Sequence, residues 1–164
     1  MKKALILCLV FIFIFTLTGC KSPSEKAAEK LTEKILEDMT GGKVDVDGDK
    51  VTIETKDGSE ISISGNEWPK DKLAKYIPKL DGNVTYVANS DAMCMIIVEG
   101  IKNAEFEKYL ERVKDAGYTQ NETNYSDSSS KTFIATNTDD EITIQITYLI
   151  ENEEVSITVG KNQK

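Results

Sequence analysis

Cys20 is the residue whose surroundings point most clearly to a defined chemistry. It closes the run Leu17-Thr18-Gly19-Cys20, and residues 4–15 before it form an unbroken apolar stretch, ALILCLVFIFIF. Two lysines directly after Met1 make the start of the chain basic. A basic start, an apolar middle and a small-residue exit are typical of a secretory signal peptide, which is removed and takes no part in the fold. We therefore predict that residues 1–19 direct export.

The segment Leu17-Thr18-Gly19-Cys20 resembles the lipobox of bacterial lipoprotein precursors. This resemblance implies that the Cys20 thiol receives a diacylglyceryl group and that cleavage leaves Cys20 as the first mature residue. The protein would then be lipid-anchored at the outer face of the cytoplasmic membrane. Two alternatives stay open. An ordinary signal peptide could carry this cysteine by chance, or the apolar stretch could anchor the chain itself, although about 12 residues is short against the ~20 that a span needs.

The charge of the chain restricts its partners. The 164 residues include 20 Lys and Arg against 28 Asp and Glu, a net charge of −8. Removing residues 1–19 takes away two lysines and no acidic residue, so the mature part carries −10. An acidic body argues against nucleic acid, which needs basic patches, and against lying flat on anionic lipid. We expect the membrane as a partner through the acyl chains on Cys20, together with an unknown envelope protein or small-molecule ligand.

The residue types needed for common catalytic chemistry are scarce. The chain has no histidine, the commonest general base and zinc ligand. Cys8 leaves with the signal peptide and Cys20 is lipidated, so Cys94 is the one thiol left and no internal disulfide can form. Cys94 lies in an apolar run, 93–98, that predicts a buried strand and an inert thiol. Composition leaves Ser–Lys and paired-carboxylate chemistry open. We expect no enzyme and no cofactor, with a carboxylate-based envelope hydrolase as the alternative.

Asp45, Asp47 and Asp49 have the alternating spacing that begins a calcium-binding loop. Position 6 of such a loop should be Gly and position 12 should be Glu, but Lys50 and Lys56 stand there. The valines around the three aspartates place them on the wet face and turn of a hairpin. We therefore predict no metal site.

Two aromatic residues are candidates for ligand binding. Trp68, the single tryptophan, stands beside Pro69 and near Tyr76, and could form an aromatic ligand platform there. The competing interpretation is that Trp68 packs between two layers, as a lone Trp beside a connector does more often. Tyr118 and Tyr125 flank a polar stretch and are expected to be exposed.

Helical and strand periodicities divide the mature chain into segments. Residues 20–66 hold the lipidated cysteine, an amphipathic helix over 24–40 and a three-stranded meander with turns at Asp47-Gly48 and Asp57-Gly58. The apolar stripe of this helix, which favours docking on the domain, consists of Ala28, Leu31, Ile35 and Met39. Residues 67–82 form a connector with a short helix. Residues 83–160 form a second module with a helix over 103–116, a polar loop over 118–130 and three closing strands.

This order predicts an α+β fold, because hairpin-linked strands alternate with few helices. An N-terminal helix and a three-stranded meander are followed by an antiparallel sheet of about five strands with one helix packed across it. The buried stripe of that helix is predicted as Phe106, Tyr109, Leu110 and Val113. We expect it to pack on strand residues Ile142, Ile144 and Ile146, which alternate with polar residues.

Several short motifs carry a further likeness: Trp68-Pro69, Ile77-Pro78 and the pattern Phe106-x-x-Tyr109-Leu110-x-x-Val113-x-x-x-Gly117-Tyr118. Over residues 60–160 the chain resembles a domain of unknown function found in small lipoproteins of clostridia-like Gram-positive bacteria. In those proteins, too, a lipobox and a helix rich in Lys and Glu precede the domain. The resemblance implies the location and a single α+β module, and it implies no activity, ligand or catalytic residue.

Overall fold

The computed structural model describes residues 23–55, 60–70, 72–139 and 141–162, with side chains from residue 29 onward. The chain divides after Gly58 into two compact units. The first unit ends at Gly58, and the second unit runs from Ser59 to Lys164. The two units are described separately below.

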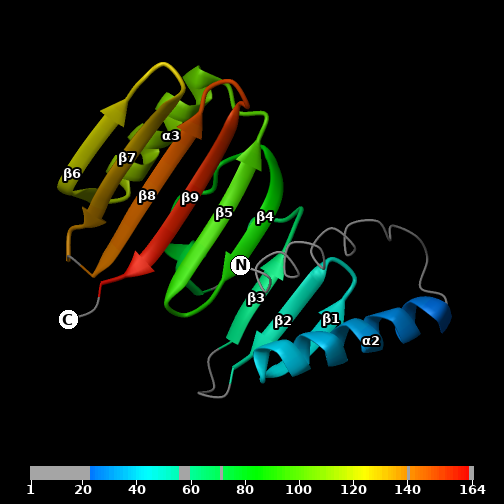
Figure 1. Ribbon diagram of the computed structural model, residues 1–164. Helices are drawn as coiled ribbons and strands as arrows, with labels where there is room; N and C mark the ends of the chain where they lie inside the picture. Colours follow the sequence, from blue (N-terminus) through cyan, green and yellow to red (C-terminus); the bar gives the residue numbers. More distant parts are fainter. Residues whose placement is uncertain (1–22, 56–59, 71, 140, 163–164) are drawn as a thin grey trace. The chain divides into compact units, whose positions relative to one another are not determined.

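The first unit consists of one helix and one β-hairpin (Figure 1). Helix α2 spans Pro23–Thr40, strand β1 spans Lys43–Asp47 and strand β2 spans Lys50–Glu54. The strands pair antiparallel with Asp47 opposite Lys50, which leaves two residues for the turn. Gly48, the first of these, has a φ of 60°, a left-handed value that glycine adopts without the steric cost of a Cβ atom. The predicted turn at Asp47-Gly48 is therefore confirmed.

The second unit contains seven strands in one antiparallel arrangement, in the order β3-β4-β5-β9-β8-β7-β6 (Figure 1). The strands are β3 (Glu60–Ser64), β4 (Asn83–Asn89), β5 (Met93–Glu99), β6 (Tyr118–Ser126), β7 (Ser130–Asn137), β8 (Ile142–Leu149) and β9 (Glu154–Lys161). A short 3-10 helix, η1 (Lys72–Tyr76), precedes β4, and helix α3 (Asn103–Asp115) joins β5 to β6. The chain thus leaves the middle of the sheet through α3, reaches the β6 edge and returns strand by strand until β9 pairs with β5.

The predicted fold class, a helix and three-stranded meander followed by a sheet of about five strands, is wrong. The described chain is dominated by antiparallel sheet, with nine strands against two α-helices and one 3-10 helix. Strand β3, predicted as the third strand of the meander, pairs with β4 through Ser62–Asn89 and Ile63–Ala88. It therefore belongs to the sheet of the second unit. Period-two alternation tells which face of a strand packs, but not which strand lies beside it.

The prediction of a polar loop over residues 118–130 is also wrong. Most of this stretch is strand β6, which lies at the edge of the sheet and pairs only with β7. Within β6, Tyr118 is buried and every later residue is exposed. Two register shifts interrupt the pairing, one before Gln120 and one after it. An exposed and bulged edge strand keeps its polar side chains in water, so it lacks the alternation by which strands are detected.

The core of the second unit lies on the face of the sheet that α3 covers. Phe106, Tyr109 and Val113 are fully buried and belong to one cluster with Ile144 and Ile146. The rings of Phe106 and Tyr148 stack with centroids 4.8 Å apart. The predicted stripe is confirmed for these three helix residues, whereas Leu110 is partly buried at the margin of the cluster.

Residues of the predicted connector also belong to this core, at the positions Leu73, Ala74, Ile77 and Leu80. Because these side chains pack with those of α3 and the strands, η1 is an integral part of the second unit.

Candidate functional site

Within the second unit, no described helix covers the second face of the sheet. Along β5, β8 and β9, residues that face the core are buried at every second position, and the residues between them are half-buried or exposed. Figure 1 shows β5, β9, β8 and β7 in front of α3, with no helix of this unit on the near side. A sheet face that is accessible across several strands is the candidate surface in this unit.

Strand pairing arranges this surface in two rows that cross the sheet. The first row is Ile63, Ala88, Met95, Thr158, Gln145, Ile134 and Thr123. The second row is Tyr86, Ile97, Ser156, Thr147, Thr132 and Tyr125. We call these residues the open face. None of them is charged, although 29% of the chain is charged. Depletion of charged residues is the feature that marks the centres of protein–protein interfaces.

The open face has an apolar half and a hydroxyl-rich half. The part over β3, β4 and β5 presents Ile, Ala, Met and Tyr side chains, whereas the part over β9, β8 and β7 presents mainly Thr, Ser and Gln. Across two strands, the hydroxyl oxygens of Thr132 and Thr147 lie 3.3 Å apart and share a hydrogen bond. Burial raises the pKa of Tyr86 above its ordinary value, so this phenol stays protonated and can donate a hydrogen bond. The surface can therefore offer apolar contact and neutral hydrogen bonds.

The two aromatic candidates, Trp68 and Tyr76, lie in different surroundings. Trp68 is partly buried and packs against the core of the second unit. The side chain of Tyr76 is 47% exposed, and the Lys75 ammonium lies 4.9 Å from the centre of its ring. A ligand platform built from this pair remains a prediction. We expected Tyr118 to be exposed, but it is buried. Its phenol reaches inward and donates a hydrogen bond to the backbone oxygen of Tyr76 at 3.2 Å.

Cys20, the predicted lipidation site, lies outside the described residues. Cys94 is a fully buried thiol on the core face of β5, as its apolar surroundings predict. No helix among the described segments has the length and apolar character to cross a bilayer.

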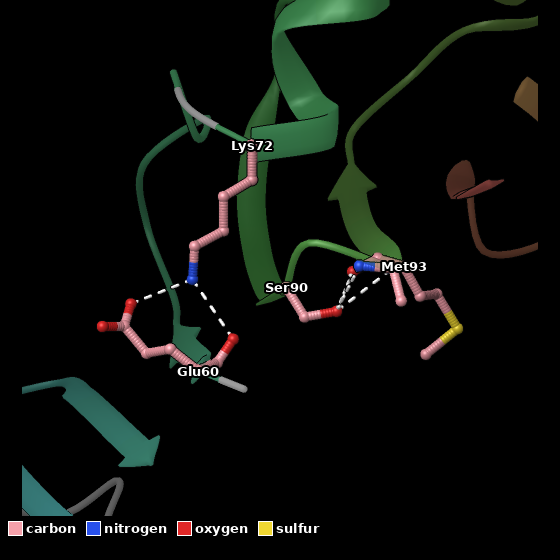
Figure 2. Close-up of polar contacts among 5 residues, drawn as sticks. Glu60, Lys72, Ser90 and Met93 are labelled. Carbon is pink, nitrogen blue, oxygen red and sulfur yellow. Dashed lines mark hydrogen bonds and ion pairs between the residues drawn. The ribbon is translucent and has the colours of Figure 1, made fainter. Parts of the chain in front are cut away.

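The structure gives specific partners to one lysine and one serine that belong to the β3–β5 end of the second unit (Figure 2). The Lys72 ammonium donates to the Glu60 carboxylate at 2.9 Å and to the Glu60 backbone oxygen at 3.2 Å. The Ser90 hydroxyl donates to the backbone oxygen of Met93 at 2.9 Å and accepts the N–H of Met93 at 3.0 Å. Figure 2 shows the Lys72 amine directed at Glu60 and the Ser90 hydroxyl directed at Met93. A Ser–Lys catalytic pair requires the hydroxyl proton to reach the amine, and this geometry does not provide that contact.

The acidic residues of the described chain form no group of three or more that could hold a metal ion. Asp45, Asp47 and Asp49 lie along β1 and its turn, as predicted.

The aspartate with the most distinctive environment, Asp127, was not singled out from the sequence. One of its carboxylate oxygens accepts the backbone N–H groups of Ser129 and Ser130, at 2.7 and 2.8 Å, and the Ser129 hydroxyl. These hydrogen bonds, first of all those from Ser129, lower the pKa of Asp127 to about 2 and fix the turn between β6 and β7.

Comparison with family models, curated proteins and solved structures finds no match to the chain. The resemblance to a domain of small Gram-positive lipoproteins is therefore still a prediction from the motifs alone. The open face was missed from the sequence because its residues, spread over seven strands, become neighbours only through the strand order.

Proposed function

We propose that the mature chain is a lipoprotein anchored through Cys20 at the outer face of the cytoplasmic membrane, and that its second unit is a non-catalytic binding module. The location rests on the lipobox-like run Leu17–Cys20 behind a basic start and an apolar stretch. The binding role rests on one observation, the uncharged open face. In a mature chain with a net charge of −10, such a surface is the part best suited to close contact with another molecule.

The partner that fits best is another protein of the cell envelope. The two rows of the open face cross six and seven strands, and adjacent strands lie about 4.8 Å apart, so each row is roughly 25–30 Å long. The two rows lie about 7 Å apart along the strands, so the open face would form the centre of a protein interface, which in total buries about 800 Å² on each partner. Thr, Ser and Gln side chains would exchange hydrogen bonds with the partner, and the Ile and Met side chains would supply apolar burial.

The anchoring is tested with Cys20→Ala. Mass spectrometry of the N-terminal peptide of the wild-type protein should show diacylglycerol on Cys20, and the variant should be missing from the membrane fraction or remain unprocessed. A variant that is processed and still bound to the membrane would contradict the proposal.

The binding role is tested with two variants that each place a lysine on the surface of the second unit. Gln145→Lys introduces a charge in the middle of the open face, whereas Glu111→Lys introduces one on the exposed side of α3. Affinity capture from envelope extract should recover the same partner with the wild-type protein and with Glu111→Lys, and lose it with Gln145→Lys. Equal recovery by the two variants would exclude the open face as the binding surface.

A further inference from the structure

Helix α2 of the first unit carries an apolar stripe on the side that does not face the hairpin. Leu31, Ile35 and Met39 are 62%, 44% and 44% exposed. This pattern reverses the expectation from the sequence, in which the stripe docks on the domain. Three large apolar side chains, spaced one helical turn apart and accessible together, form a continuous surface.

Two glutamates explain why the helix takes this orientation. The Glu37 carboxylate accepts the N–H of Val44 at 3.3 Å, and the Glu33 carboxylate accepts the N–H of Val46 at 3.1 Å. Four residues advance a helix by about 6 Å, and two residues advance a strand by about 6.8 Å. The two carboxylates therefore match consecutive outward N–H groups of strand β1. This contact satisfies backbone donors at the edge of the hairpin.

The same contact sets the direction of the apolar stripe. Ile35 is two residues from Glu33 and two from Glu37, which places it roughly 200° around the helix from each of them. Leu31 and Met39 extend the stripe by one turn in either direction. As long as the glutamates bind β1, the stripe must point away from the hairpin. Lys30 and Lys34 are exposed beside it, and Asp38 is exposed there as well.

We propose that this stripe lies in the interface of the bilayer that holds the lipid on Cys20. The inference rests on the proposed anchoring. Two residues separate Cys20 from Pro23, the first residue of α2, so the two Cα atoms are at most about 11 Å apart. The helix thus begins at the membrane surface. A helix with one apolar face, and with lysines whose ammonium groups can reach the headgroups, is the type that lies in the interface plane.

The lipid on Cys20 removes the usual objection to so short a stripe. Three side chains bind a bilayer weakly when the protein must come from solution. When the lipid already holds the helix beside the bilayer, the stripe contacts the membrane intramolecularly, and its effective concentration at the bilayer surface is high. The acidic body of the protein gives no general attraction to anionic lipid, so the contact depends on burial of the stripe. Glu33 and Glu37, two of the acidic residues of α2 that would oppose it, are turned to the hairpin.

The test measures the depth of α2 in lipid. The lipidated protein is reconstituted in vesicles of phosphatidylethanolamine and phosphatidylglycerol that contain phosphatidylcholine brominated on its acyl chains. All variants carry Trp68→Phe, so that a single introduced indole reports. Ile35→Trp places the indole on the stripe, and Tyr125→Trp places it at an exposed position of the second unit. Bromine should remove most of the fluorescence of the indole at position 35 and little of that at position 125.

The two proposals fail in different ways. Absence of diacylglycerol from the N-terminal peptide refutes the anchoring itself. If the lipid is present and the indole at position 35 is quenched no more than the one at position 125, the interfacial helix is refuted. In that case a blue-shifted and unquenched emission from position 35 means that a protein surface covers the stripe, either a second copy or a partner. As a second measurement, Leu31→Ser combined with Ile35→Ser should increase hydrogen exchange of α2 in the lipidated, vesicle-bound protein while leaving exchange of the non-lipidated mature chain in buffer unchanged, and an equal increase in both would also refute the inference.

Discussion

The phenol of Tyr109 in α3 donates a hydrogen bond to the backbone oxygen of Pro78, with 3.1 Å between the two oxygen atoms. Two similar contacts lie on either side of it. Arg112 donates to the backbone oxygen of Lys79 at 3.0 Å, and Tyr118 donates to that of Tyr76 at 3.2 Å. Tyr76 ends η1 and the other two residues follow it, so side chains of α3 and β6 donate hydrogen bonds to the backbone where this short helix stops. The connector is thereby fixed to the core.

Tyr109→Phe should lower the free energy of unfolding by about 1 kcal/mol, because the ring stays in place and the partly buried Pro78 oxygen loses its partner. Urea unfolding followed by circular dichroism measures the change. Tyr76→Phe removes a hydroxyl from an exposed ring and is the control, with an expected change within about 0.5 kcal/mol. Similar losses in the two variants would show that the bond to Pro78 contributes nothing.

Phe106→Ala should cost roughly 3–5 kcal/mol, because it removes a fully buried ring that stacks on Tyr148 and leaves a cavity. Leu110→Ala should cost less, since Leu110 is partly buried at the margin of the core. Lys108→Ala, on the exposed side of α3, is the control. Thermal unfolding should rank the variants in that order, and a larger loss at position 110 than at position 106 would mean that the orientation of α3 is different.

Tyr118 should make the protein sensitive to high pH. Burial raises its pKa to about 12, above the ordinary value of 10 in the unfolded chain. Between these values the folded state holds a proton that the unfolded state has lost, so stability is complete below pH 10 and falls as the pH rises toward 12. The expected loss by pH 12 is about 2 kcal/mol. In urea titrations over this range, Tyr118→Phe should show a shallower decline than the wild-type protein. Parallel curves would contradict the shift.

Asp127 should make the stability of the fold depend on pH in the acidic range. Its pKa of about 2 lies below the ordinary 3.8, so the unfolded chain takes up the proton first. The contribution of Asp127 is present above pH 4 and is lost as the pH falls toward 2. NMR titration of the side-chain carboxyl should report the low pKa directly, and Ser129→Ala should move it upward by removing the hydroxyl donor. A titration near 3.8 in the wild-type protein would show that the turn does not hold the carboxylate.

The elements that were predicted correctly are those with one regular apolar period. Phe106, Tyr109 and Val113 recur at helical spacing, and Ile142, Ile144 and Ile146 alternate, so each pattern identifies both the element and its buried face. Strand β6 shows the limit of this approach. Its side chains after Tyr118 are in water, and its bulges break the period, so composition alone could not separate it from a loop.

Local sequence patterns could not predict which distant elements contact one another. Nothing near Ile63 indicates that its strand pairs with β4. The alignment of Thr158, Gln145 and Ile134 in one row depends on two strand pairings at once. In α2, an apolar stripe predicted the buried face, but Glu33 and Glu37 bind β1 and reverse it. The lipobox-like run differs from these cases, because a targeting signal is recognised from its linear sequence and does not depend on contacts between distant elements.

The sheet of the second unit can be completed only by the last strand of the chain. Met93 pairs with Gly160, and Glu99 pairs with Glu154, so the middle of the sheet joins two segments that are far apart in the sequence. Until β9 arrives, β5 exposes an apolar edge that other chains could join. Such non-local pairing also slows folding. A chain shortened before β9 would lose the strand between β5 and β8, so the sheet can close only after the residues of β9 have been synthesised.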